Sequence, residues 1–243
     1  MVNDYLLYLK GPNSETWQQA LERLALFCRN LHAFEVEGEI YEAFFDEYYE
    51  DGTLFEKHEP VPDSDLVEAE SKLNFSMPVE LRELFKSRFV IYDVSIELGR
   101  WGERQILGIN KKWWENTSCL QPLCEAIAWI FGPYFAESEL TEMEVKHLNE
   151  TYFAFGNWSD DDHSSTYLLV DRHGGFGHFD FHTEDYPGNL ERLTPLLNGK
   201  KLSKTLDEVL VWVIDRAMNY LLYRNEIPCD NPLGCTTCNP HKN

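Results

Sequence analysis

Three short runs of aromatic and aliphatic residues form the clearest pattern in the chain. They cover residues 152–155, 167–170 and 176–181, and turn-forming residues bound each run, which is typical of strands. Two glycines in the segment 172–175 predict a tight hairpin between the second and third runs. The connection at 157–165 is longer and contains three consecutive aspartates, so an acidic loop is expected there. The pattern therefore predicts a three-stranded meander.

A proline-containing linker at residues 58–62 precedes a predicted pair of helices. Apolar residues recur in both helices at three- and four-residue steps. Asp63 or Ser64 is expected to cap the first helix, which ends near Asn74. Pro78 is expected to open the second helix, because a missing N–H does no harm at that position.

The same periodicity predicts three further helices. One begins near residue 13, and a strongly apolar one covers residues 119–131 and ends at a Gly-Pro step. The last begins at Thr205, whose spacing to Glu208 is that of a capping box. Residues 137–150 are expected to form an acidic surface helix or loop.

One more strand is predicted at residues 90–98, where apolar residues alternate with other residues. A partner strand around residues 105–109 would complete a hairpin with it. After the meander, the Pro-Gly step at 187–188 and Pro195 are expected to break the chain. Residues 198–199, Asn-Gly, are expected to form a turn.

Net charge limits the partners that the protein can have. The 243 residues include 42 acidic and 21 basic side chains, which gives a formal charge of −21. A surface of that sign repels phosphate backbones, so it argues against nucleic-acid binding and favours a basic partner. The alternative, that the negative charge only maintains solubility, stays open.

Nothing in the sequence predicts a membrane or secreted protein. No segment reaches the roughly 18 consecutive apolar residues of a membrane span, and the first four residues do not resemble a secretory signal. The six scattered cysteines do not form the framework of a small secreted domain. We therefore expect a cytoplasmic protein with mostly reduced thiols.

The helix pair, the meander and the last helix resemble, in this order, three blocks of the SMI1/KNR4, or SUKH, superfamily. The first block is carried by Glu70, Leu73, Met77, Pro78, Leu81 and Phe85. The second is carried by the strands ending at Gly156, Asp171 and His182, with their acidic loop and glycine turn. The resemblance covers residues 63–88 and 151–222, while residues 87–89 and 162–164 depart from the usual Asn-Gly and Gly-Asp steps.

This resemblance implies an α+β fold, in which a central, mainly antiparallel sheet is flanked by helices. Residues 61–225 are expected to form the SMI1/KNR4-like domain, with a middle insertion at 89–150. Residues 1–60 are expected to pack on it as a helix-containing extension. Residues 226–243 form a tail rich in cysteine and proline.

The resemblance also implies a non-enzymatic immunity protein, which neutralises a bacterial toxin, often a nuclease, and needs no cofactor. Negative charge fits this role, because a nuclease presents basic surface to its phosphate substrate. The expected partner is therefore a basic protein, namely a polymorphic toxin domain. The acidic loop is expected to supply the contact surface, formed by Trp158, Asp160, Asp161, Asp162 and His163.

Two other residue groups could carry chemistry. Four zinc-type ligands occur in the tail, although only one cysteine pair has standard spacing, and a disulfide or a loose tail is the alternative. These ligands are Cys229, Cys235, Cys238 and His241. The meander's aspartates, with Asp171 and His182, could hold a cation or act as acid and base, although loop aspartates commonly form turns. A metal-binding regulator, a hydrolase and a regulatory scaffold are therefore alternative functions.

Overall fold

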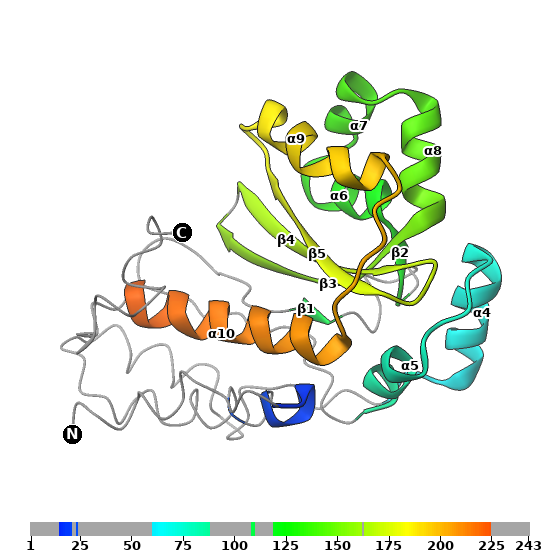
Figure 1. The fold of residues 1–243 in the computed structure, drawn as a ribbon, viewed down its shortest axis with the longest axis vertical. Helices are drawn as coiled ribbons and strands as arrows, with labels where there is room; N and C mark the ends of the chain where they lie inside the picture. Colours follow the sequence, from blue (N-terminus) through cyan, green and yellow to red (C-terminus); the bar gives the residue numbers. More distant parts are fainter. Residues whose placement is uncertain are drawn as a thin grey trace.

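The computed structural model describes residues 15–20, 23, 60–87, 108–109, 119–161 and 163–224. These residues form an antiparallel sheet with helices on both of its faces (Figure 1). This arrangement confirms the predicted α+β fold.

The sheet is built around the predicted meander of β3 (Tyr152–Asp161), β4 (Ser164–Asp171) and β5 (Phe176–His182). Two short strands, β1 (Gly108–Ile109) and β2 (Gln121–Pro122), pair with different parts of the other edge of β3. All of these pairings are antiparallel, so hairpins alone connect the three long strands.

The prediction of an acidic loop between the first two strands is wrong for much of its length, because β3 continues to Asp161. The register of β3 against β4 shifts twice, near Gly156 and between Trp158 and Asp161. Asn157 Nδ2 donates to Ser165 Oγ at 3.3 Å, and this hydroxyl donates to the Trp158 carbonyl at 3.3 Å. The bulges and these bonds keep a polar segment within the sheet.

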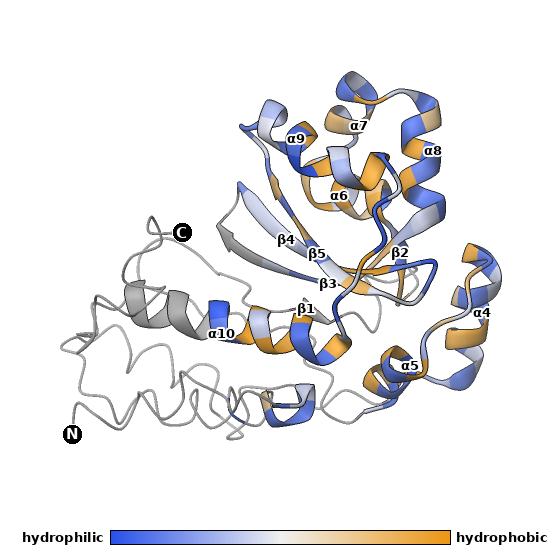
Figure 2. Ribbon diagram, in the orientation of Figure 1, coloured by the Kyte–Doolittle hydropathy of each residue, from blue (hydrophilic) through white to orange (hydrophobic). Residues whose placement is uncertain are grey.

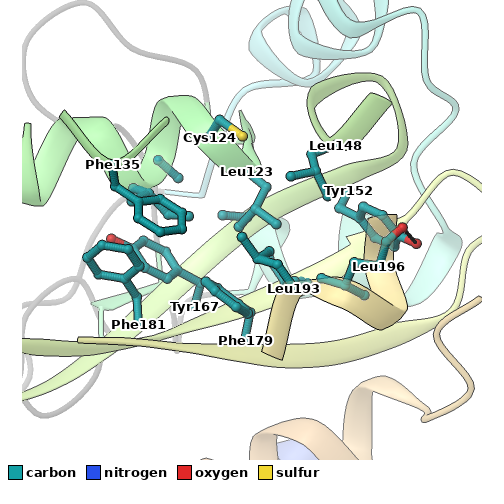
Figure 3. Packing of buried hydrophobic residues seen from close by; sticks show 14 residues of the cluster. Leu123, Cys124, Phe135, Leu148, Tyr152, Tyr167, Phe179, Phe181, Leu193 and Leu196 are labelled. Carbon is teal, nitrogen blue, oxygen red and sulfur yellow. Dashed lines mark hydrogen bonds between the residues drawn. The ribbon is translucent and has the colours of Figure 1, made fainter. Parts of the chain in front are cut away.

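One face of the sheet is covered by α6 (Leu123–Phe131), α7 (Tyr134–Glu139), α8 (Glu142–Thr151) and α9 (Tyr186–Leu197). Alternate residues of the long strands point towards these helices and form an apolar core with them (Figure 3). Its buried side chains include Leu123, Leu148, Tyr152, Tyr167, Phe179, Phe181, Leu193 and Leu196. The removal of this surface from water is the main driving force for the assembly of the layer.

The opposite face is covered by α10 (Leu206–Arg224). Its buried side chains include Leu206, Val209, Leu210, Val213 and Ile214. The predicted capping box is confirmed, because Thr205 N donates to Glu208 Oε2 at 2.7 Å and Glu208 N donates to Thr205 Oγ1 at 3.2 Å. These bonds satisfy N–H groups for which the helix itself has no acceptor.

The described part of the N-terminal segment docks on α10. The Trp17 N–H donates to Asp207 Oδ1 at 2.8 Å. Arg23 Nη2 lies 2.7 Å from both Glu15 Oε2 and Asp215 Oδ1. The Arg23 and Glu15 side chains are buried, so solvent screens this ion pair little. The rest of the predicted N-terminal extension lies outside the described residues.

The predicted helix pair is present as α4 (Asp63–Leu73) and α5 (Val79–Lys86). The first helix ends at Asn74, which adopts the left-handed conformation with φ 46°. A proline occupies the N-cap position of each helix, as expected for the second helix only. The prediction that Asp63 or Ser64 caps α4 is therefore wrong, although its first turn still carries acidic charge.

The prolines predicted to break the chain after the meander lie inside α9, so this prediction is wrong. Pro187 is the second residue of α9, where an N–H would have no partner within the helix. Pro195 lies in the last turn, next to Leu196, which is buried in the core. Asp185 begins the helix by accepting a bond from the Gly188 N–H at 3.0 Å.

Part of the predicted middle insertion belongs to the layer that covers the sheet. It supplies α6, α7 and nearly all of α8 to this layer, and β1 and β2 to the sheet itself. The apolar helix expected from residue 119 begins at Leu123, because residues 121–122 pair with β3. The predicted strand at 90–98 and the tail at 226–243 lie outside the described residues, so the domain boundaries stay a prediction.

We predict that Gly175→Ala lowers the free energy of unfolding by about 3 kcal/mol. A Cβ atom at this position would lie 2.0 Å from the Leu202 carbonyl oxygen, so the backbone would have to move. Gly199→Ala is the control, because its φ of +74° strains alanine but a Cβ atom meets nothing within 4 Å. This control is expected to lose about 1 kcal/mol in urea unfolding. Equal losses in the two variants would contradict the close approach at Gly175.

Candidate functional site

Asp171, a predicted cation ligand or acid–base group, has a structural role. Its carboxylate is buried, and Oδ1 accepts bonds from the N–H groups of His173 and Gly175 at 2.8 and 3.0 Å. Oδ2 accepts a bond from the Leu202 N–H at 2.7 Å. These three hydrogen bonds use both oxygens of the carboxylate and stabilise the turn between β4 and β5.

His182 is also engaged by the neighbouring backbone. Its Nδ1 accepts a bond from the Glu184 N–H at 3.1 Å, and its own N–H and carbonyl bond to the Asn189 side chain. The exposed His163 ring stacks on the His182 ring, with the centroids 6.5 Å apart. His163 Nδ1 lies 3.4 Å from Thr183 Oγ1. The two histidines therefore form a pair at the surface beside the β3–β4 hairpin.

The residues predicted as the contact surface fall into two environments. Trp158 is only 2% exposed, so its indole cannot serve as a surface anchor in this conformation. Asp160 and Asp161 lie at the end of β3, near the exposed His163, while Asp162 lies outside the described residues. The hairpin thus has Asp160 and Asp161 at the end of its first strand and places the tryptophan inside.

Trp158 belongs to a cluster of cations and aromatic rings between the sheet and α10. The Arg216 guanidinium carbon lies 4.6 Å from the centre of the Trp158 ring and 5.3 Å from that of Trp212. His178 stacks on Trp212 with ring centroids 4.0 Å apart. Arg216 Nη1 also lies 3.6 Å from Asp180 Oδ1. These contacts fix α10 against the polar end of the sheet.

Within the part of the chain that the structure describes, no three His, Cys, Asp or Glu side chains are grouped so that they could hold a metal ion. The predicted zinc ligands lie outside that part; they are Cys229, Cys235, Cys238 and His241. Cys119 and Cys124 are buried. Burial raises the pKa of the Cys124 thiol to about 12, so this residue acts as an apolar core side chain.

A surface formed by α7 and the start of α8 combines apolar and acidic side chains. Tyr134 is 70% exposed and Met143 is 81% exposed. From the start of α6 to the first turn of α8, the sequence contains five glutamates and no lysine, arginine or histidine. Figure 2 shows that hydrophilic and hydrophobic residues alternate along α8. We call the exposed residues Tyr134, Glu137, Glu139, Glu142 and Met143 the α7–α8 surface.

This surface is held on a firmly anchored helix. Thr141 donates to Glu144 Oε2 from its N–H at 2.8 Å and from its hydroxyl at 2.7 Å, and accepts a bond from the Glu144 N–H at 3.3 Å. The two bonds to the carboxylate lower the pKa of Glu144, so it stays ionised at neutral pH. Leu148, on the inner side of α8, is buried in the core. These contacts fix the backbone from which the exposed side chains of α8 project.

A groove of about 1020 Å³ lies between the end of α4, β2 and α8. The charged side chains that line it are Lys72, Glu125, Lys146, Glu150 and Arg172. Met143, Lys146 and Glu150 follow one another at three- and four-residue steps, which places them on one side of α8. The groove therefore opens beside the α7–α8 surface.

Sequence reasoning misses the groove but predicts part of the α7–α8 surface, because residues 137–150 are expected to form an acidic surface helix or loop. The groove joins four parts of the chain that are far apart in sequence, so no local pattern could reveal it. The α7–α8 surface had a usable signal, because a run of glutamates without any basic residue indicates a solvated acidic face. The exposure of Tyr134 and Met143 had no such signal.

Comparison of the chain with protein-family models, with curated proteins and with solved structures gave no match. The resemblance to the SMI1/KNR4 superfamily therefore stays a prediction. Among the described helices, none has the length and apolar character needed to cross a membrane.

We predict that His178 makes the protein less stable as the pH falls below the ordinary histidine range. Burial lowers the pKa of His178 from 6.5, and Lys204 and Arg216 add to this shift while Asp180 opposes it. The unfolded chain therefore binds this proton first as the pH falls. The free energy of unfolding should decrease from pH 6.5 down to the folded-state pKa.

The variant His178→Phe tests this prediction, because it keeps a ring against Trp212 and removes the titration. Urea unfolding at about pH 8 and about pH 5 should show a smaller loss of stability in the variant than in the unaltered protein. The exposed His173 gives the control, and His173→Gln should lose as much as the unaltered protein. An unchanged pH dependence in His178→Phe would contradict the prediction.

Proposed function

We propose that this chain is a non-enzymatic protein-binding module that recognises a basic protein through the α7–α8 surface. The observation that carries this proposal is the exposure of Tyr134 and Met143 among glutamates in a stretch without basic residues. Aromatic and methionine side chains are enriched at protein interfaces, and tyrosine is common among the residues that contribute most to binding. The surrounding carboxylates would then select a partner of positive charge.

Electrostatic attraction would act both at long range, before contact, and locally at the interface. A formal charge of −21 attracts a basic protein before contact and raises the rate of association. This attraction fades beyond about 8 Å at physiological ionic strength, so orientation depends on charges near the interface. Glu137, Glu139 and Glu142 would provide these local charges, because all three are exposed. Binding should therefore weaken as salt is added.

We further propose that the partner is a bacterial toxin domain, possessing the basic cleft of a nuclease, which the protein blocks. This step is supported by the sign of the charge and by the resemblance to the SMI1/KNR4 superfamily. The bonds made by the Asp171 carboxylate and by His182 Nδ1 also support a binding role, because these atoms are committed to backbone partners. The described residues offer no specific observation in favour of the metal-dependent alternative.

We predict that reversing three charges on the α7–α8 surface weakens partner binding about 100-fold, or roughly a factor of five for each charge. The variant combines Glu137→Lys, Glu139→Lys and Glu142→Lys. The partner to test is the toxic domain encoded immediately upstream of this chain, in a catalytically inactive form. Calorimetric titration at low and high salt measures the affinity and its salt dependence.

The control variant combines Glu80→Lys, Glu83→Lys and Glu191→Lys, which are exposed residues on α5 and α9. It changes the net charge by the same amount, so it should lose affinity only about fivefold through the long-range field. Equal losses in both variants would show that overall charge, rather than the α7–α8 surface, determines binding. The absence of a toxin gene upstream would overturn the immunity role.

A further inference from the structure

The groove beside α8 has a rim whose basic side chains already have partners. Lys72 Nζ lies 2.6 Å from Glu68 Oε1, and Lys146 Nζ lies 3.8 Å from Glu150 Oε1. Arg172 donates from Nε to the Glu150 carbonyl and from Nη1 to the Asn74 carbonyl, the latter at 2.9 Å. Its guanidinium also lies over the Phe153 ring. These cations are therefore poorly placed to capture an anionic ligand.

Two residues that line the groove, Gln121 and Glu125, offer hydrogen-bond acceptors to a ligand. Gln121, on β2, is 7% exposed, and its Oε1 is buried without a hydrogen-bond partner. A buried carbonyl oxygen without a donor is unfavourable, and such an atom in a native fold calls for an explanation. Gln121 lines the groove, so a change in its side-chain torsions would bring this oxygen within reach of a ligand. A ligand that donates hydrogen bonds would relieve the cost.

Glu125 supplies a second acceptor on the same wall. It lies four residues after Gln121, in the first turn of α6, and also lines the groove. Its side chain is accessible from the groove, yet the surrounding protein removes enough water to raise the pKa of the carboxyl. A carboxylate in such surroundings gains more from a cationic partner than one in open solvent does.

The two acceptors and the shape of the groove together indicate the ligand. A guanidinium group has five N–H donors in a rigid plane, so it can donate to a carboxylate and to an amide oxygen at once. Leu73, Leu120 and Pro122 line the same groove and offer apolar surface to a methylene stem. An ammonium group would match the charge but would lack this planar fork. We propose that the groove binds the side chain of an arginine residue of a partner protein, through Glu125 and Gln121.

This inference rests on the proposed function for the identity of the partner, because a basic protein is the expected source of such an arginine. The groove shares α8 with the α7–α8 surface, so one interface could cover both. The chemistry of the groove is nevertheless independent of that surface. The two proposals can therefore fail separately.

Nα-acetyl-L-arginine amide is the probe for the first experiment, titrated into the full chain labelled with nitrogen-15. The side-chain amide signal of Gln121 and the backbone signals of residues 120–125 report on the groove. We expect a saturable shift with a dissociation constant on the order of 1 mM, as for other fragments of this size. Glu125→Gln should weaken binding about tenfold, because it removes a charge-assisted hydrogen bond.

Three comparisons decide the outcome. Nα-acetyl-L-citrulline amide has the same shape without the charge, and it should bind about tenfold more weakly than the arginine probe. Glu83→Gln, which removes an exposed carboxylate on α5, should leave the affinity for the probe unchanged. Equal binding of the two probes, no effect of Glu125→Gln, or the absence of a saturable shift at Gln121 would each overturn the proposal.

A last comparison separates this proposal from the proposed function. The α7–α8 variant with three lysines should lose its protein partner but keep its affinity for the arginine probe. Glu125→Gln should weaken binding of the toxin domain about tenfold if that domain inserts an arginine. A toxin domain that binds both variants like the unaltered protein would overturn both proposals. Loss of toxin binding in the lysine variant alone would overturn the arginine site only.

Discussion

The buried carboxylate of Asp171 is the constraint on which the arrangement of the two helical layers depends. It accepts two bonds within the β4–β5 turn and a third from Leu202, which precedes α10. The chain crosses from one face of the sheet to the other in this region, and Phe176 and Lys204 exchange backbone bonds there. A buried carboxylate without these donors would be very costly, so the turn and the crossing segment form together. This coupling fixes where α10 begins.

The two faces of the sheet use different physical interactions. The face under α6, α8 and α9 buries an apolar core. Apolar contacts have no preferred direction, but close packing makes the core sensitive to changes in side-chain volume. At its polar end, the face under α10 relies on stacking of His178 on Trp212 and on Arg216 between two tryptophans. Such contacts depend on geometry and charge state. Changes of pH should therefore act on the α10 side first.

Local sequence patterns predict the long strands, the helix pair and the last helix, because each is encoded by periodicity and end signals within one segment. They fail where distant contacts override local preference. β3 continues through polar residues because β4 supplies partners for Asn157 and Trp158, and α9 accepts Pro195 because Leu196 is buried. The groove could not be predicted, since Gln121 and Glu125 meet the ends of α4 and α8 only in the fold.

Helix α8 separates the residues that maintain the fold from those that would contact the proposed partner. Leu148 and the capping box of Thr141 hold its inner side and its start, whereas Met143 and Glu142 point into solvent. A period of 3.6 residues separates these two roles on one element. Substitutions on the outer side change shape and charge at little cost in stability, because no core contact is lost. In the proposed function, such a helix would allow the contact surface to change along with the sequence of the partner. The acceptors in the neighbouring groove would still require an arginine in that partner.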